Sequence, residues 1–262
     1  MTTFKIDSSD WLDMVIDGQQ RKLLSNDAWE RFNTVLLGVG DLTQPATATD
    51  TIAAVFDLEG FTNFCKQIEP QLAVPVFLSE FLTWLMDQVK ATRIREVKPK
   101  GYWLYSPLPF FVKFMGDGIL FLWDSSAMTD AARRNVVLSL NRVCVRYVNK
   151  FLPEIRKKVV EPPGYLRCGV ARGTVFSVGN GNDFVGSCIN MAARIQKLPG
   201  TRFAFNRRGF DLESTSRSKF FKDDIVVKLV SIRGIGDNEL IAIRKSEYES
   251  MSAEDKERYR EP

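Results

Sequence analysis

The sequence contains no histidine among its 262 residues. This absence excludes catalysis by a histidine general base, Ser–His and Cys–His nucleophilic pairs, and zinc sites held by imidazole. Any chemistry must therefore use carboxylates, lysine, arginine, asparagine, hydroxyl groups or thiols.

Cysteine is scarce, and long apolar runs are absent. The four cysteines form no C-x-x-C pair and lie in apolar stretches, which predicts buried, reduced thiols in a reducing compartment. No apolar run approaches the roughly 20 residues that span a bilayer, and residues 1–11 lack the apolar core of a signal peptide. We expect a soluble cytoplasmic protein without membrane insertion.

A strong excess of one charge is also missing. The chain has 36 basic and 32 acidic residues, a formal net charge of +4. This balance is short of the basic footprint of a nucleic-acid-binding protein, so no nucleic acid binding is expected. A basic site for an anionic small molecule fits it equally well.

The pattern along the chain predicts three regions. Residues 1–48 form an N-terminal helical extension, in which Ser25 offers a helix cap before Trp29 and Phe32. Residues 49–245 form the main domain. Residues 246–262 form a charged C-terminal tail, expected to be a frayed, solvated helix.

The main domain alternates strand and helix patterns. Strands are predicted at 51–57, 111–115, 119–123, 165–171, 175–179, 202–206, 225–230 and 239–243. Helices are predicted over 74–89, from 129 to a stop at Pro153, and over 187–197, with a loop at 98–109. This order predicts an α+β fold with a ferredoxin-like split β-α-β arrangement, in which helices flank a central mixed sheet.

Two aspartates are placed for metal binding. Asp57 ends a buried strand in FDLEGFT (residues 56–62), and Asp117 occupies the hairpin turn of KFMGDG (residues 113–118). Adjacent strands would bring the two carboxylates together, and with no His ligand such a pair suits a hard cation, Mg²⁺ or Mn²⁺. Either Asp alone could serve turn geometry only.

A third motif lies on the helix in DFVGSCINMAARIQ (residues 183–196). Asn190, Arg194 and Lys197 follow i, i+4, i+7 spacing and share the polar face of the helix. Taken alone, this pattern favours a solvated helix face.

Together, these motifs resemble the signatures of class III adenylyl and guanylyl cyclases. The two metal signatures are followed by YLRCGVARGTV (residues 165–175), which resembles the family's glycine-containing strand pair, and by the helix motif. The resemblance covers residues 51–243 and implies a cyclase fold and a nucleoside triphosphate substrate.

The resemblance also implies residue roles. Asp57, Asp117 and the Leu58 carbonyl would hold two metal ions, Mn²⁺ or Mg²⁺. Asn190 would orient the ribose, and Arg194 would stabilise charge on the α-phosphate. Further nucleotide contacts are implied for Lys113 and Asp183 at the base, and for Arg202 and Arg233 at the triphosphate. Arg233 stands where the family has lysine, which keeps the charge and changes the geometry.

In this family the site lies between two domains, so the resemblance implies a homodimer with composite active sites. The pair Lys113 and Asp183 matches the adenylyl-type combination. Phe56, where purine cyclases have a small residue, could instead narrow the pocket and stack on a smaller base, or could be a core residue.

The whole chain is also similar to the bacterial pyrimidine cyclases of Pycsar anti-phage systems. That resemblance implies UTP as substrate, with cyclic UMP as a signal for a separate effector. Cytidylate and adenylate cyclases of the same mechanism are the alternatives within the family. An alternative of another class is an inactive cyclase-homology dimer that acts as a binding module. A cyclic-dinucleotide synthase is disfavoured because the motif G-G-[DE]-E-F is absent.

Overall fold

The computed structural model describes residues 4–91, 96–97, 102–103, 108–211 and 219–262. It contains two compact units. The N-terminal unit comprises residues 1–48 and 176–185, and the sheet unit comprises residues 49–175 and 186–262.

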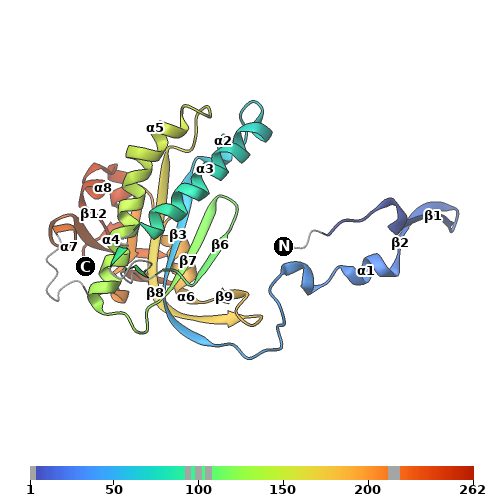
Figure 1. Ribbon diagram of the computed structural model, residues 1–262, viewed down its shortest axis with the longest axis horizontal. Helices are drawn as coiled ribbons and strands as arrows, with labels where there is room; N and C mark the ends of the chain where they lie inside the picture. Colours follow the sequence, from blue (N-terminus) through green and yellow to red (C-terminus); the bar gives the residue numbers. More distant parts are fainter. Residues whose placement is uncertain (1–3, 92–95, 98–101, 104–107, 212–218) are drawn as a thin grey trace. The chain divides into compact units, whose positions relative to one another are not determined.

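A mixed sheet organises the sheet unit. Its strands are β3 (Ala48–Glu59), β6 (Phe111–Phe114), β7 (Gly118–Asp124), β8 (Tyr165–Val178), β10 (Phe203–Asn206), β11 (Ile225–Ile232), β12 (Gly236–Arg244) and β13 (Tyr259–Arg260). They lie in the order β13-β11-β12-β10-β8-β3-β7-β6, and β9 (Asp183–Val185) pairs with the end of β8 (Figure 1). The run β8-β3-β7-β6 is the ferredoxin-like order, so the predicted α+β fold is confirmed.

Two long helices cover one face of this sheet, α3 (Pro70–Lys90) and α4 (Asp130–Arg146). The helix predicted over 74–89 lies within α3, and its apolar stripe Phe77, Phe81 and Leu85 packs in a core with Ile52 and Phe56 of β3. By length and composition α3 is apolar enough to cross a membrane. Its buried stripe shows that it packs here as a core helix.

The opposite face of the sheet is covered in part by α6 (Ser187–Ile195). Here Gly169 of β8 explains the glycine in YLRCGVARGTV. A Cβ at this position would lie 2.2 Å from the carbonyl oxygen of Ala192 and 2.5 Å from the backbone nitrogen of Gln196. Only glycine lets the strand and the helix approach this closely.

The predicted stop at Pro153 is wrong. Helical structure continues from α4 through a π-helix, Tyr147–Phe151, into α5 (Leu152–Ile155). Pro153 lies in the first turn of α5, where proline is tolerated because the missing N–H needs no partner. The Tyr147 hydroxyl anchors this segment by donating a hydrogen bond of 2.6 Å to the Pro163 carbonyl.

Two further predictions need correction. The predicted strands at 165–171 and 175–179 are one continuous strand, β8, because Gly173 and Thr174 keep the extended backbone. Of the predicted loop at 98–109, residues 98–101 and 104–107 lie outside the described residues. Within it, β5 (Tyr102–Trp103) pairs with β4 (Glu96–Val97).

The C-terminal tail is ordered on the sheet and is not a frayed helix. It forms α8 (Lys245–Ser250), α9 (Ala253–Lys256) and β13, which pairs with β11. Tyr259 is buried, and its hydroxyl donates to the Pro199 carbonyl at 2.7 Å. Glu247 of α8 accepts a hydrogen bond of 3.0 Å from the backbone N–H of Arg202. Short helices α2 (Phe61–Phe64) and α7 (Lys219–Asp223) complete the unit.

The N-terminal unit is not purely helical. It contains a hairpin of β1 (Trp11–Ile16) and β2 (Gln19–Leu24), followed by α1 (Asn26–Arg31). The hairpin turn is Asp17-Gly18, with φ of 52° and 74°, the left-handed pair that a tight turn requires. As predicted, Ser25 caps α1 by accepting a hydrogen bond from the backbone N–H of Ala28.

Candidate active site

The two predicted metal aspartates lie side by side on neighbouring strands. Asp57, near the end of β3, pairs in register with Gly118 of β7, the residue that follows Asp117. The Leu58 backbone N–H donates to the Asp117 carbonyl at 3.3 Å, which joins the two segments. Gly116, with φ of 90°, allows the tight turn that carries Asp117.

Both carboxylates line one pocket of about 360 Å³. The other lining residues are Leu58, Gly60, Phe61, Thr62, Asn63, Arg167 and Lys197. We call this the carboxylate pocket. Asp57 is only 8% exposed, so its charge is largely removed from water and requires compensation.

Arg167 of β8 supplies that compensation, and sequence reasoning did not select it. Its Nη2 lies 2.6 Å and its Nε 3.2 Å from Oδ2 of Asp57. A charged side chain in the otherwise apolar run YLRCGVA was the available signal. The pocket therefore combines two carboxylates with two cations, Arg167 and Lys197.

The residues of the pocket fit a divalent cation whose remaining ligands are water and the phosphates of a substrate. Among the described residues, no group of three or more His, Cys, Asp or Glu side chains forms a metal cage. Mg²⁺ is commonly held by one or two carboxylates together with water and substrate phosphates. Asp57 and Asp117 provide such a pair, and the two cations would favour the phosphates.

Asn190 and Arg194 lie outside the carboxylate pocket of the same chain. Both are exposed on α6, and Lys197, in the turn that follows this helix, lines the pocket. Arg194 lies beside the turn between β11 and β12, since a Cβ at Gly234 would be 3.5 Å from its Nη2. Arg233, the preceding residue, is exposed in this turn. The structure thus brings Arg194 close to the turn that carries Arg233.

Arg202 lies at the start of β10, next to β8 in the sheet. Phe203 pairs with Cys168, so Arg202 neighbours Arg167. However, the Arg202 guanidinium stacks on the Tyr165 ring, 3.6 Å from its centroid, and is not among the residues that line the carboxylate pocket. Between these two arginines, the structure places Arg167 in the pocket.

The predicted base-reading residues lie on separate strands. Lys113 of β6 pairs with Leu120, which pairs with Val55, so Lys113 shares the sheet face of Asp57. Asp183 begins β9 in the N-terminal unit, and its carboxylate accepts a hydrogen bond of 2.9 Å from the Phe184 backbone N–H.

Phe56 is a core residue in the structure. Its side chain is fully buried and packs edge-on against Phe121, with ring centroids 5.8 Å apart. Strand alternation directs the Phe56 side chain to the sheet face that α3 and α4 cover, opposite the face of Asp57. The proposed stacking of Phe56 on a base therefore has no support from this geometry.

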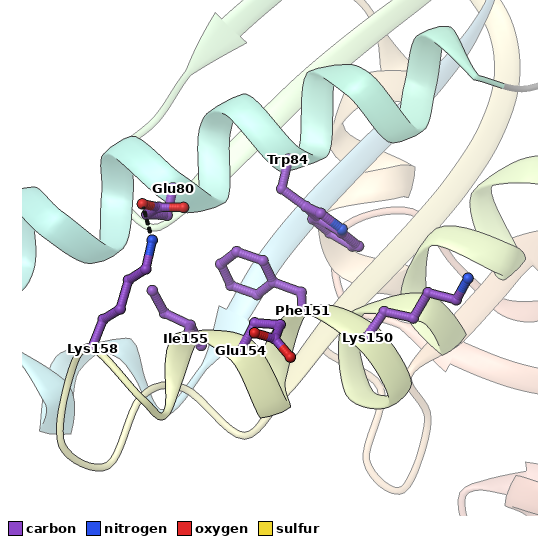
Figure 2. Close-up of a pocket in the computed structure, with 7 residues that line it drawn as sticks. All are labelled: Glu80, Trp84, Lys150, Phe151, Glu154, Ile155 and Lys158. Atoms are coloured by element: carbon purple, nitrogen blue, oxygen red, sulfur yellow. Dashed lines mark hydrogen bonds and ion pairs between the residues drawn. The ribbon is translucent and has the colours of Figure 1, made fainter.

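A second pocket, of about 250 Å³, lies between α3 and the segment from Lys150 to Lys158 (Figure 2). Trp84, Phe151 and Ile155 form its apolar floor, and Glu80 and Lys158 form an ion pair at its rim. It contains none of the predicted site residues.

Comparisons with known proteins give a limited likeness. The chain is similar in structure to the catalytic core of a rhodopsin-guanylyl cyclase with converted specificity, in complex with ATPalphaS, at 15% identity and a TM-score of 0.47, covering 77% of this chain and 98% of that one. It is also similar to the guanylyl cyclase domain of the RhoGC fusion protein from the aquatic fungus Blastocladiella emersonii (14%, TM-score 0.45, 77% and 100% covered).

An adenylate/guanylate cyclase/hydrolase from Silicibacter pomeroyi is similar at 14% identity and a TM-score of 0.44, with 76% of this chain and 98% of that one covered. No protein-family model matches the sequence, and no curated protein matches it. At these scores the likeness assigns no activity.

Proposed function

We propose that this protein is a class III nucleotidyl cyclase that converts a nucleoside triphosphate into its 3′,5′-cyclic monophosphate and pyrophosphate. The observation that carries the proposal is the carboxylate pocket. It places Asp57 and Asp117 together, beside Arg167 and Lys197, in a chain that has no histidine.

In the proposed reaction, the ribose 3′-hydroxyl oxygen attacks the α-phosphorus, and the bond to the bridging oxygen of pyrophosphate breaks. Divalent ions held by Asp57, Asp117 and the Leu58 carbonyl would lower the pKa of the hydroxyl and support the leaving group. Arg167 and Lys197 would bind the triphosphate through charge-assisted hydrogen bonds. The remaining catalysis is positioning and electrostatic stabilisation, for which histidine is not needed.

Asn190 and Arg194 would act on the nucleotide held by a second copy of the chain. Neither lines the carboxylate pocket of its own chain, and both are exposed on α6. A homodimer with composite sites accounts for this separation. Asn190 would orient the ribose, Arg194 would stabilise charge at the α-phosphate, and Arg233 would contact the triphosphate.

For the base we propose uracil, with UTP as substrate and cyclic UMP as a cytoplasmic signal for a separate effector in anti-phage defence. This choice rests on the resemblance of the sequence to pyrimidine cyclases. Lys113 and Asp183 are the proposed base-reading residues, and they favour adenine in purine cyclases, so ATP and CTP are the competing substrates.

The deciding experiment incubates the purified protein with Mn²⁺ and an equimolar mixture of ATP, GTP, CTP and UTP, and identifies cyclic monophosphates by mass spectrometry. We expect cyclic UMP as the main product. Cyclic AMP or cyclic CMP would correct the base and keep the mechanism. No cyclic product would favour the inactive binding module.

The matched control is Asp57→Asn or Asp117→Asn in the same assay. Each change keeps the size of the side chain and removes a metal-binding charge. Because a catalytic metal contributes several kcal/mol, we expect turnover below about one-thousandth of the wild-type rate. Substantial remaining turnover, with the fold intact by circular dichroism, would show that these carboxylates are not the metal ligands.

A further inference from the structure

The N-terminal arm, residues 4–42, exposes an unusual amount of apolar surface. It carries ten of the 23 exposed large apolar side chains in the described part of the chain. They are Ile6, Trp11, Leu12, Met14, Val15, Trp29, Phe32, Val35, Leu37 and Leu42. Within the arm only Ala28 is buried. Apolar surface on this scale usually marks an interaction site.

The arm nevertheless has defined internal structure. Asp10 accepts a hydrogen bond of 2.7 Å from Arg31, and the Ser25 backbone N–H donates to the Asp10 carbonyl at 2.9 Å. The rings of Phe4 and Phe32 lie edge to face with centroids 5.3 Å apart. These contacts join the hairpin to α1, so the apolar side chains belong to a shaped surface.

This surface cannot be stabilised by the arm alone. Both strands of the β1–β2 hairpin are exposed over most of their length. A single two-stranded hairpin is marginally stable in water and usually needs a packed face. The arm therefore requires another surface to cover its apolar side chains.

The arm and the segment that follows it, up to Thr47, contact β8 and the turn after it within the N-terminal unit. The Thr47 backbone N–H donates to the Ser177 hydroxyl at 2.7 Å, and the Ser177 N–H donates to the Thr47 carbonyl at 2.9 Å. A Cβ at Gly179 would lie 1.3 Å from the Val39 carbonyl oxygen, so the two backbones touch. A partner that binds the arm would therefore also be held to the end of β8.

The charge distribution indicates which partner fits. Residues 1–48 contain seven acidic and four basic side chains, whereas the remaining residues contain 25 acidic and 32 basic ones. The extension is thus net negative, by three charges, and the rest of the chain is net positive, by seven. Complementary charge of this kind steers and orients association. The rest of a second copy of this chain carries the opposite net charge.

We propose that the N-terminal arm packs against the sheet unit of a second copy and stabilises the homodimer. The inference rests on the proposed function only for the expectation that two copies assemble. The apolar side chains of the arm provide the buried centre of the contact, and its acidic residues provide a polar rim. The arm would therefore hold the two halves of each composite site together.

The test uses the full-length chain and a double variant, Trp29→Ser/Val35→Ser. These side chains are 74% and 72% exposed, so the change should leave the fold of one chain intact. The control is Ile68→Ser/Val160→Ser, at two side chains of the sheet unit that are 93% and 75% exposed. The dimer dissociation constant is measured for all three proteins by sedimentation velocity over a concentration series, at low and high salt.

We expect the arm variant to raise the dissociation constant by about tenfold or more. Replacing two apolar side chains that are buried in the contact should cost at least about 1.4 kcal/mol of binding free energy, which corresponds to that factor. The control should match the wild type, and high salt should weaken the wild-type dimer. An unchanged constant for the arm variant, or a wild-type chain that stays monomeric, would overturn the proposal.

Two other surfaces could cover the arm, and each would give a distinct result. If the arm covers the sheet unit of its own chain, the arm variant lowers the unfolding temperature and leaves the dissociation constant unchanged. If it binds a different protein, neither quantity changes. Sedimentation does not depend on turnover. A chain that dimerises through the arm but makes no cyclic nucleotide would thus keep this inference and lose the proposed function.

Discussion

At the scale of single residues, the ion pair between Arg167 and Asp57 neutralises the charge of this buried carboxylate. The guanidinium donates two hydrogen bonds to Oδ2 of Asp57, whose carboxylate would also hold the divalent cation in the proposed site. Arginine and metal therefore compete for this carboxylate. In the proposed reaction, metal binding to Asp57 would release the Arg167 guanidinium, which could then bind the triphosphate.

This competition predicts opposite effects of Arg167→Ala on metal and on nucleotide. Without the guanidinium, Asp57 is a buried, unpaired charge, so the metal-free variant should be less stable than the wild type. Mn²⁺ alone should then bind more tightly and raise the unfolding temperature by more than it does in the wild type. Nucleotide affinity should fall by about tenfold, because a charge-assisted contact is lost.

The measurements are Mn²⁺ titration by electron paramagnetic resonance, thermal unfolding with and without Mn²⁺, and titration with a fluorescent nucleotide. Arg172→Ala is the matched control. Arg172 also pairs with an aspartate, Asp50, but it does not line the carboxylate pocket. If Arg167→Ala and the control change Mn²⁺ affinity alike, the competition is absent.

At this scale the sequence predicted the positions of those residues whose type and local turn determine where they lie. Asp57 follows a strand and Asp117 occupies a Gly-Asp-Gly turn, and both patterns are local. Arg167 and Arg202 are both charged residues next to apolar strands, on neighbouring positions of β8 and β10. Which of them enters the pocket depends on the packing of Tyr165 under Arg202, which no local pattern predicts.

At the scale of elements, the contact between β8 and α6 determines where the polar face of α6 lies. Gly169 is the position at which the helix backbone approaches the strand most closely among the glycines of β8. Asn190 and Arg194 project from α6, and Lys197 lies in the turn that directly follows the helix. A shift of α6 would therefore move all three together.

We predict that Gly169→Ala lowers the free energy of unfolding by about 1–3 kcal/mol and reduces turnover. The added Cβ would lie 2.2 Å from a backbone oxygen of α6, so the helix must move away from the sheet. Denaturant unfolding and a cyclase assay at saturating metal measure the two effects. Gly164→Ala is the control, because a Cβ there meets nothing within 4 Å. Equal stability of the two variants would contradict the close approach.

The elements that sequence patterns predicted well are those with a clear period. The α3 stripe and the β6–β7 hairpin are examples. The errors occurred where tertiary contacts override a local signal. Pro153 was predicted to end a helix, yet the π-helix resets the register and places it in a first turn. The tail has the composition of a solvated helix, yet Tyr259 buries itself against the sheet.

At the scale of the whole molecule, the proposed activity would require two copies of the chain. The carboxylate pocket contains Asp57 and Asp117, while Asn190 and Arg194 are exposed outside it. A monomer would thus hold the metal and the triphosphate without the groups expected to act on the ribose and the α-phosphate. The sequence carries both sets of residues, but it contains no pattern that shows how two copies meet.

Composite sites predict that two inactive variants restore activity when they are mixed. In a heterodimer of Asp57→Asn and Arg194→Ala chains, one site receives both defects and the other receives none. Random pairing of equal amounts makes half of the dimers heterodimers, so about one quarter of all sites should be intact, provided that the chains exchange. Turnover of the mixture should therefore approach one quarter of the wild-type rate, while each variant alone stays near background. The mixture of Asp57→Asn with Asp117→Asn is the control, since both changes affect the same half-site and each composite site of that heterodimer keeps one defect. Activity in the control as high as in the test mixture would show that the site is not divided between chains in this way. If the test mixture is inactive although mass spectrometry of the intact complex demonstrates heterodimers, Asp57 and Arg194 act in the site of a single chain.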